Sequence, residues 1–159
     1  MTVISCVNPD EKDLQLIRYV KPSHIENGSA TDEEFQLRED RSPPEEYISF
    51  FHSTEKNIEN KIQFVIFALR KRQKNFAIKK TGGFLFLNST QASEDINITN
   101  EIVQFKKCNY PHYGMYYLSD DIVDIIEAKT ILMYYSELYL NQGLERSVKS
   151  HNQKIQRTV

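Results

Sequence analysis

The chain has 159 residues, of which 40% are hydrophobic, and a formal net charge of −2 at pH 7. A chain of this length forms one domain and buries enough apolar surface to fold without cross-links. The small net charge excludes a bulk attraction to nucleic acid or to membrane surfaces, and no apolar run approaches the ~20 residues that cross a bilayer. We expect one domain over residues 1–143 and a polar, basic tail over residues 144–159.

The two cysteines, Cys6 and Cys108, are far apart in the sequence. The first residues lack the basic start and the apolar stretch of a secretory signal. Because disulfides are rare in reducing compartments, we expect a cytoplasmic protein with both thiols free. A disulfide between Cys6 and Cys108 is the less favoured alternative. Neither cysteine belongs to a Cys-x-x-Cys pair and the histidines are widely separated, so we expect no metal site. No phosphate-binding glycine loop or dinucleotide fingerprint is present, so we expect no cofactor.

The first predicted element is a strand over residues 14–20, with apolar side chains on both faces, which is typical of an internal strand. Pro22 ends this strand, because proline has no N–H to donate to a sheet. Asn27 and Gly28 predict a turn. Residues 34–38 predict a short strand or an ordered loop.

Two helices are predicted next. Ser42-Pro-Pro-Glu-Glu is typical of a helix start and predicts a helix that continues to Phe51. A second helix is predicted from Ile58 to Leu69, where apolar residues recur at spacings of three and four.

The second half of the chain predicts four short strands, a long polar loop over residues 88–100, and a last helix. Gly82-Gly83 predicts a hairpin between the first two strands. Ser119 begins the last helix, whose inner stripe runs from Ile122 to Tyr139 and which ends at Gly143. The four strands are residues 76–78, 84–87, 102–105 and 113–118.

This order of elements indicates an α+β fold with a mostly antiparallel sheet of about five strands and two or three packed helices.

Two histidines lie beside prolines at the ends of predicted strands, His24 after the first strand and His112 before a later one. An imidazole titrates near neutral pH, so it can act as a general base or bind a substrate. Arg18 and Lys21 lie near His24 in the sequence and could bind an anion. We therefore take Arg18, His24 and His112 as catalytic candidates and expect the two imidazoles to meet at one edge of the sheet. The alternative for each histidine is a residue that bonds only to the backbone.

Tyr113 and Tyr116, with Lys21, are candidate ligand-binding residues. They fit an alternative function, a small nucleotide- or NAD-directed transferase of the ADP-ribosyl-transferase-like toxin class. In that hypothesis Arg18 binds phosphate, His24 contacts the ribose and a tyrosine stacks on the base.

The segment over residues 70–80 is basic and contains no acidic residue. A third hypothesis is that Lys71, Arg72 and Lys74 contact nucleic-acid phosphates while Phe76 stacks on a base. The competing explanation is that a helix C-terminus collects lysine and arginine because its dipole is negative there. Nucleic acid is therefore a less favoured partner than protein.

A loose set of positions resembles a group of small uncharacterised bacterial proteins. Their pattern has a proline, a histidine, a glycine, a small residue and a phenylalanine after the first strand, a Gly-Gly before an apolar strand, and a Pro-His step before the last helix. The resemblance implies a bacterial accessory protein and carries no activity. In this chain the positions are Pro22, His24, Gly28, Ala30, Phe35, Gly82, Gly83, Pro111 and His112.

Catalytic motifs are missing, whereas an acid-rich segment over residues 26–46, the basic segment and many tyrosines suit a partner surface. We expect a small, soluble, non-enzymatic module without a membrane segment that binds another protein, in a bacterial toxin–antitoxin, immunity or phage-defence system.

Overall fold

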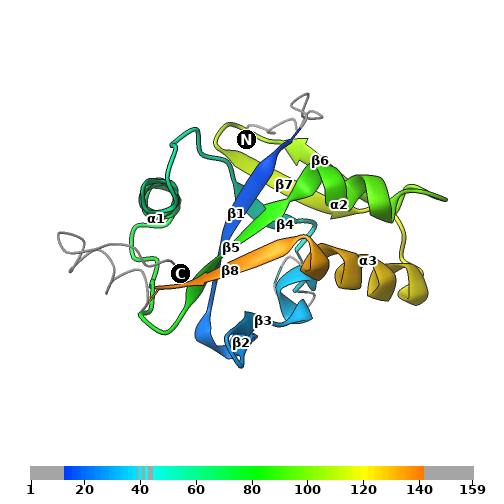
Figure 1. Ribbon diagram of the computed structural model, residues 1–159, viewed down its shortest axis with the longest axis horizontal. Coiled ribbons are helices and arrows are strands. Elements are labelled where there is room, and N and C mark those ends of the chain that lie inside the picture. The colour runs from blue at the N-terminus through cyan, green and yellow to red at the C-terminus, as the bar shows by residue number, and fades with distance from the viewer. Residues whose placement is uncertain (1–12, 39, 41, 43–44, 142–159) are drawn as a thin grey trace.

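The computed structural model describes residues 13–141, except residues 39, 41, 43 and 44. Its main feature is one antiparallel sheet of six strands, in the order β6-β7-β4-β1-β5-β8 (Figure 1). The expected α+β class is confirmed, with one more strand in the sheet than predicted. The strands are β1 (Gln15–Val20), β4 (Ile48–Phe51), β5 (Gly83–Asn88), β6 (Val103–Lys107), β7 (His112–Tyr117) and β8 (Ser136–Leu140).

The segment after β1 forms a small separate unit. It contains two 3₁₀ helices, η1 (Pro22–His24) and η2 (Asp32–Phe35), and between them a two-stranded sheet of β2 (Ile25–Glu26) and β3 (Ser29–Ala30). The predicted turn is confirmed, because Asn27 and Gly28 join β2 to β3 with positive φ angles of 52° and 79°. Both residue types tolerate this left-handed conformation.

Helices cover the two faces of the main sheet unequally. Helix α1 (Ile58–Arg72) packs on one face, where its buried residues form a cluster with residues of β1, β4 and β5. Helices α2 (Ser89–Ile96) and α3 (Ile122–Tyr134) pack on the other face, over the larger core cluster. Figure 1 shows α2 and α3 side by side, with α1 apart from them. Alternation along the strands directs Leu16 toward α2 and α3 and Ile17 toward α1.

The predicted helix over residues 42–51 is wrong, because Ile48–Phe51 forms strand β4 in the middle of the sheet. Ile48 and Phe50 belong to one core cluster and Phe51 to the other. Because β4 is buried on both faces, its residues form a continuous apolar run. The helix-start motif at residues 42–46 led us to interpret this run as part of a helix. Pairing with β1 and β7 satisfies the backbone and overrides the local signal.

The predicted loop over residues 88–100 is also wrong, because α2 occupies Ser89–Ile96. The Asn88 side chain caps this helix by accepting a hydrogen bond from the Gln91 N–H. After the helix, the Asn97 amide bonds to the outer edge of β6: Oδ1 accepts from the N–H groups of Ile102 and Val103, and Nδ2 donates to the Val103 carbonyl. This arrangement occupies backbone groups that an edge strand otherwise leaves unpaired.

Residues 76–78 are not a strand, and Gly82-Gly83 does not make a hairpin. Strand β5 pairs instead with β1 and β8. The glycine at 82 is needed for close packing, since a Cβ there would lie 2.5 Å from the Tyr19 hydroxyl and 2.7 Å from the Val20 carbonyl oxygen.

The last predicted helix is confirmed at its start but ends early. Asp121, rather than Ser119, is the N-cap, and its side chain accepts from the N–H groups of Val123 and Asp124. The helix ends at Tyr134, and Tyr139 lies in β8, because the edge of β5 offers a partner strand. The start of the predicted tail, at residue 144, lies outside the described residues.

Cys108 is disulfide-bonded, so the expectation of a free thiol there is wrong; Cys6 lies outside the described residues. Among the described helices, none has the length and apolar character needed to cross a membrane.

Candidate functional site

Arg18 and His24, two of the three catalytic candidates, are brought together by Glu34. The Arg18 Nε–H donates to one Glu34 carboxylate oxygen at 2.7 Å, and His24 Nδ1 lies 2.5 Å from the other. The Glu34 side chain is only 2% exposed. Because a carboxylate accepts but does not donate, the proton between His24 and Glu34 is on Nδ1.

The same cluster continues into strand β4. Arg18 Nη1 donates to the Ser49 carbonyl oxygen at 2.8 Å, and the guanidinium carbon lies 5.7 Å from the centroid of the Phe50 ring. His24 Nε2 is directed toward the exposed carboxylate of Glu33, at 3.8 Å. Two donor groups of Arg18 therefore bind inside the protein, and the cluster fastens η1 and η2 to the sheet. The Lys21 side chain is exposed, and its backbone carbonyl accepts a hydrogen bond from the His24 N–H at 2.9 Å.

His112 is buried on the opposite face of the sheet. Its Nε2 lies 3.1 Å from the Ser49 hydroxyl oxygen, and its ring contacts the rings of Tyr47 and Phe51. Burial, followed by the positive charge of Arg72, lowers the pKa of His112 to about 4. The imidazole is therefore neutral at pH 7 and serves as a hydrogen-bonding core residue.

The two histidines do not meet at one edge of the sheet, and that prediction is wrong. His112 pairs with Phe51, which stands level with Ile17 in the middle of β1. His24 lies beyond the end of β1, on the side of the sheet that carries Phe50. Side chains alternate between faces along a strand, so Ser49 contacts Arg18 through its carbonyl and His112 through its side chain from opposite sides.

The remaining candidates are dispersed. Tyr113 is fully buried in the core, whereas Tyr116 is half-buried on the α1 side of β7. Lys71, Arg72 and Lys74 are exposed at the end of α1 and just after it. The Phe76 ring contacts Tyr19 edge-on, with centroids 5.7 Å apart, so it packs against the protein instead of standing out to receive a base.

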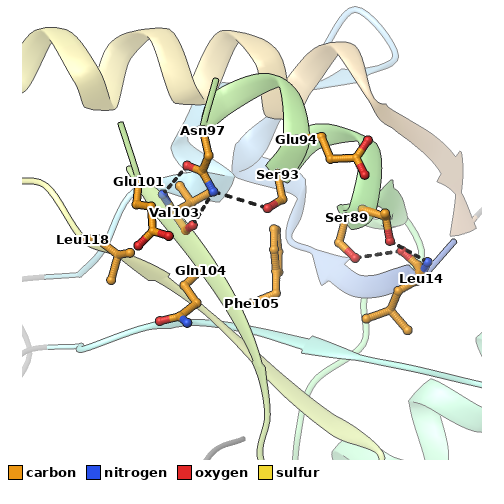
Figure 2. Close-up of a pocket in the computed structure, with 11 residues that line it drawn as sticks. Leu14, Ser89, Ser93, Glu94, Asn97, Glu101, Val103, Gln104, Phe105 and Leu118 are labelled. Carbon is orange, nitrogen blue, oxygen red and sulfur yellow. Dashed lines mark hydrogen bonds between the residues drawn. The ribbon is translucent and has the colours of Figure 1, made fainter. Parts of the chain in front are cut away.

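A polar pocket of about 330 Å³ opens between α2 and the edge of β6 (Figure 2). Ser89, Thr90 and Ser93 contribute hydroxyl groups, and Glu94 and Glu101 contribute carboxylates. Sequence reasoning missed this pocket, because it treated residues 88–100 as a loop.

Leu118 lines this pocket and also begins an exposed apolar patch. The patch consists of Leu118, Ile122, Val123 and Ile126, which are 47%, 72%, 58% and 56% exposed. Ile122 and Ile126 are one helical turn apart and share a face of α3. The prediction that Ile122 faces inward is wrong, since Ala128 and Leu132 are the buried residues of this helix.

The surroundings of the apolar patch are acidic. Residues 81–105 and 108–128 contain no lysine or arginine, and these two segments supply the pocket and the patch, apart from Leu14. Six acidic residues there are exposed: Glu94, Asp95, Glu101, Asp120, Asp121 and Glu127. The absence of lysine and arginine from these two segments can be read from the sequence. The predicted loop over residues 88–100 and the predicted inward-facing Ile122 did not indicate that the segments form an exposed surface.

Within the described part of the chain, no group of three or more histidine, cysteine, aspartate or glutamate side chains is arranged to hold a metal ion. In comparisons with known proteins, no family model, no curated protein and no solved structure matches this chain.

Proposed function

We propose that the protein is a protein-interaction module that uses the apolar patch and the adjoining α2–β6 pocket to bind an apolar, basic segment of another protein. The observation that carries the proposal is four large apolar side chains, each about half exposed or more, between Leu118 and Ile126. Three of them, Ile122, Val123 and Ile126, lie on one side of α3 by helical spacing. A contiguous exposed apolar surface rimmed by polar groups is characteristic of a binding site.

The charges around the patch select the partner. Exposed Asp120, Asp121 and Glu127 stand within the same stretch of chain as the apolar side chains, and the segments that form this surface contain no basic residue. A partner with lysine or arginine next to apolar residues would therefore gain both burial and charge complementarity. A second copy of this chain would bring carboxylates against carboxylates, which disfavours self-association through this surface.

The pocket supports a specific role for one basic side chain of the partner. Its lining is rich in hydroxyl and carboxylate oxygens, including those of Ser93, Glu94 and Glu101. These are acceptors for an ammonium or guanidinium group. Because Leu118 belongs to both surfaces, a partner could place an apolar residue on the patch and a neighbouring lysine or arginine in the pocket.

The test uses a fluorescein-labelled amphipathic peptide with leucine on one face and lysine on the other, followed by fluorescence anisotropy. We expect binding that Ile122→Asp weakens by about tenfold or more, because the substitution places a charge in the contact. Phe67→Asp is the matched control, since Phe67 is 65% exposed on α1, and its binding should match the wild type.

Equal affinity for a peptide with glutamate in place of lysine would contradict the charge argument. Unchanged binding by Ile122→Asp would contradict the location. Sedimentation analysis tests whether the patch binds a second copy of this chain. A wild-type dimer that Ile122→Asp dissociates would show self-association through the patch and contradict binding of a different protein there.

The expected role in a bacterial toxin–antitoxin, immunity or phage-defence system remains part of this proposal. We do not propose a cytoplasmic location, because Cys108 is disulfide-bonded and disulfides are typical of oxidising compartments. The alternative of a transferase loses its main support, since Arg18 binds Glu34 and Ser49 rather than facing outward to a phosphate.

A further inference from the structure

Among the residues that the structure describes, α1 covers only part of its face of the sheet. The core cluster under α1 contains residues of β1, β4 and β5, and Tyr139 of β8 packs against it, but it includes no residue of β6 or β7. Ile48 and Phe50 of β4 and Tyr113 and Met115 of β7 belong to the opposite cluster. By alternation, the intervening side chains lie on the α1 side. We call this surface the aromatic face: Tyr47, Lys106, His112, Gly114 and Tyr116.

Gly114 allows two tyrosine rings to lie close to the sheet. A Cβ at this position would be 3.1 Å from Cδ1 of Tyr47 and 3.1 Å from Cε1 of Tyr116. The two ring centroids are 5.2 Å apart at an interplanar angle of 42°, and the Tyr47 ring is 5.5 Å from that of His112. A glycine inside a strand often marks the close approach of another group, and here it makes room for a low aromatic platform.

Basic side chains adjoin the platform. Lys106 Nζ lies 5.0 Å from the centroid of the Tyr116 ring, and Lys107 Nζ lies 5.6 Å from that of Tyr110 at the neighbouring turn. Arg72, at the end of α1, is close enough to lower the pKa of His112. Glu46 is the carboxylate close enough to raise the pKa of Tyr116, after the effects of burial and Tyr47.

We infer that the aromatic face binds single-stranded nucleic acid, with bases stacked on Tyr47 and Tyr116 and phosphates contacted by Lys106 and Arg72. Stacking platforms combined with cations are the common solution for binding single strands without strict sequence preference. A duplex hides its base faces and cannot use the platform in this way.

This site is distinct from the one expected at residues 70–80. Arg72 is shared, but Tyr47 and Tyr116 take the stacking role expected of Phe76, whose ring packs on Tyr19. It is also separate from the apolar patch, because that patch is on α3 and the segment before it, and α3 covers the other face of the sheet. The two proposals therefore succeed or fail independently.

The test measures the anisotropy of a fluorescein-labelled oligouridylate at ~50 mM and ~200 mM salt. We expect Tyr116→Leu to weaken binding by about tenfold, the scale of one lost stacked base, and Tyr116→Phe to stay within about twofold because the ring is retained. Lys106→Gln should lower the slope of log affinity against log salt by about one. Tyr134→Leu is the aromatic control, since Tyr134 is 80% exposed on α3, and its affinity should equal that of the wild type.

Several results would overturn the inference. They are the absence of binding at ~100 µM protein and low salt, an unchanged affinity of Tyr116→Leu, or equal binding to a duplex of the same length. Displacement of the oligonucleotide by an equal concentration of uridine monophosphate would instead assign the face to a mononucleotide. Circular dichroism checks the fold of each variant, and if Tyr116→Leu unfolds, the salt slope of Lys106→Gln decides: an unchanged slope rejects the site.

Discussion

Replacing Glu34 by glutamine should destabilise the protein far more than the loss of one surface charge would. The buried carboxylate accepts hydrogen bonds from Arg18 Nε at 2.7 Å and from His24 Nδ1 at 2.5 Å. An amide supplies one acceptor oxygen, and its NH₂ group would face one of these two donors. The Arg18 guanidinium would also lose its counter-charge while only 23% exposed.

The expected cost follows from these two effects. Removing one partner of a fully buried ion pair costs about 3–5 kcal/mol, and leaving a charged donor unpaired costs about 1.5–3 kcal/mol. Partial hydration of Arg18 and a change of His24 tautomer both reduce the loss, so we expect the free energy of unfolding to fall by about 2–3 kcal/mol.

Urea unfolding followed by circular dichroism measures this loss. The matched control is Glu33→Gln, since the neighbouring Glu33 is 63% exposed and lies 3.8 Å from His24 Nε2; it should remain within about 0.5 kcal/mol of the wild type. If Glu34→Gln also stays within that range, then Glu34 does not fasten the 3₁₀ segments to the sheet, and the role assigned to the cluster is wrong.

Three further predictions concern stability and redox state. The pKa of His112 in the folded protein is about 4, against an ordinary value of 6.5. Between these two pH values the unfolded chain binds more protons than the folded protein. The contribution of His112 to the free energy of unfolding should therefore be complete above pH 6.5 and fall by up to ~3 kcal/mol as the pH drops to 4. Urea unfolding across this range should show the fall, and His112→Gln should remove that part of the pH dependence. Asn97→Ala removes three hydrogen bonds to the edge of β6 and should lower the unfolding free energy by about 2 kcal/mol, whereas the exposed control Asn100→Ala should change it by less than about 0.5 kcal/mol. Cys108 should resist maleimide labelling in the folded, unreduced protein and become labelled after reduction and unfolding, as peptide mass spectrometry would detect; labelling before reduction would contradict the disulfide.

Local patterns predicted several elements correctly. The alternation and proline stop around residues 14–20 gave β1, and the repeated spacing of apolar residues gave α1. These signals work because they arise within a few residues of the chain. The same reasoning failed at Ile48–Phe51, where hydrogen bonds to two distant strands, β1 and β7, fix the conformation.

The candidate site was less accessible to sequence reasoning. Arg18 and His24 were singled out, but Glu34, the residue that joins them, looked like one of several acids in a charged segment. Its burial follows from the fold of the intervening η1, β2 and β3. This fold brings Arg18 and His24, which precede Glu34 by 16 and 10 residues, into contact with its carboxylate. No local feature distinguishes it from the exposed Glu33 beside it.

By itself, the sequence determined the α+β class, the internal first strand, the long amphipathic helix and the gap in positive charge over residues 81–105 and 108–128, because each depends on composition or short-range periodicity. Tertiary structure alone decided which side of α3 stays exposed and that Tyr47, Lys106 and Tyr116 share a surface. A helical or strand pattern specifies that a face exists, whereas the covering of that face depends on which distant segments pack against it.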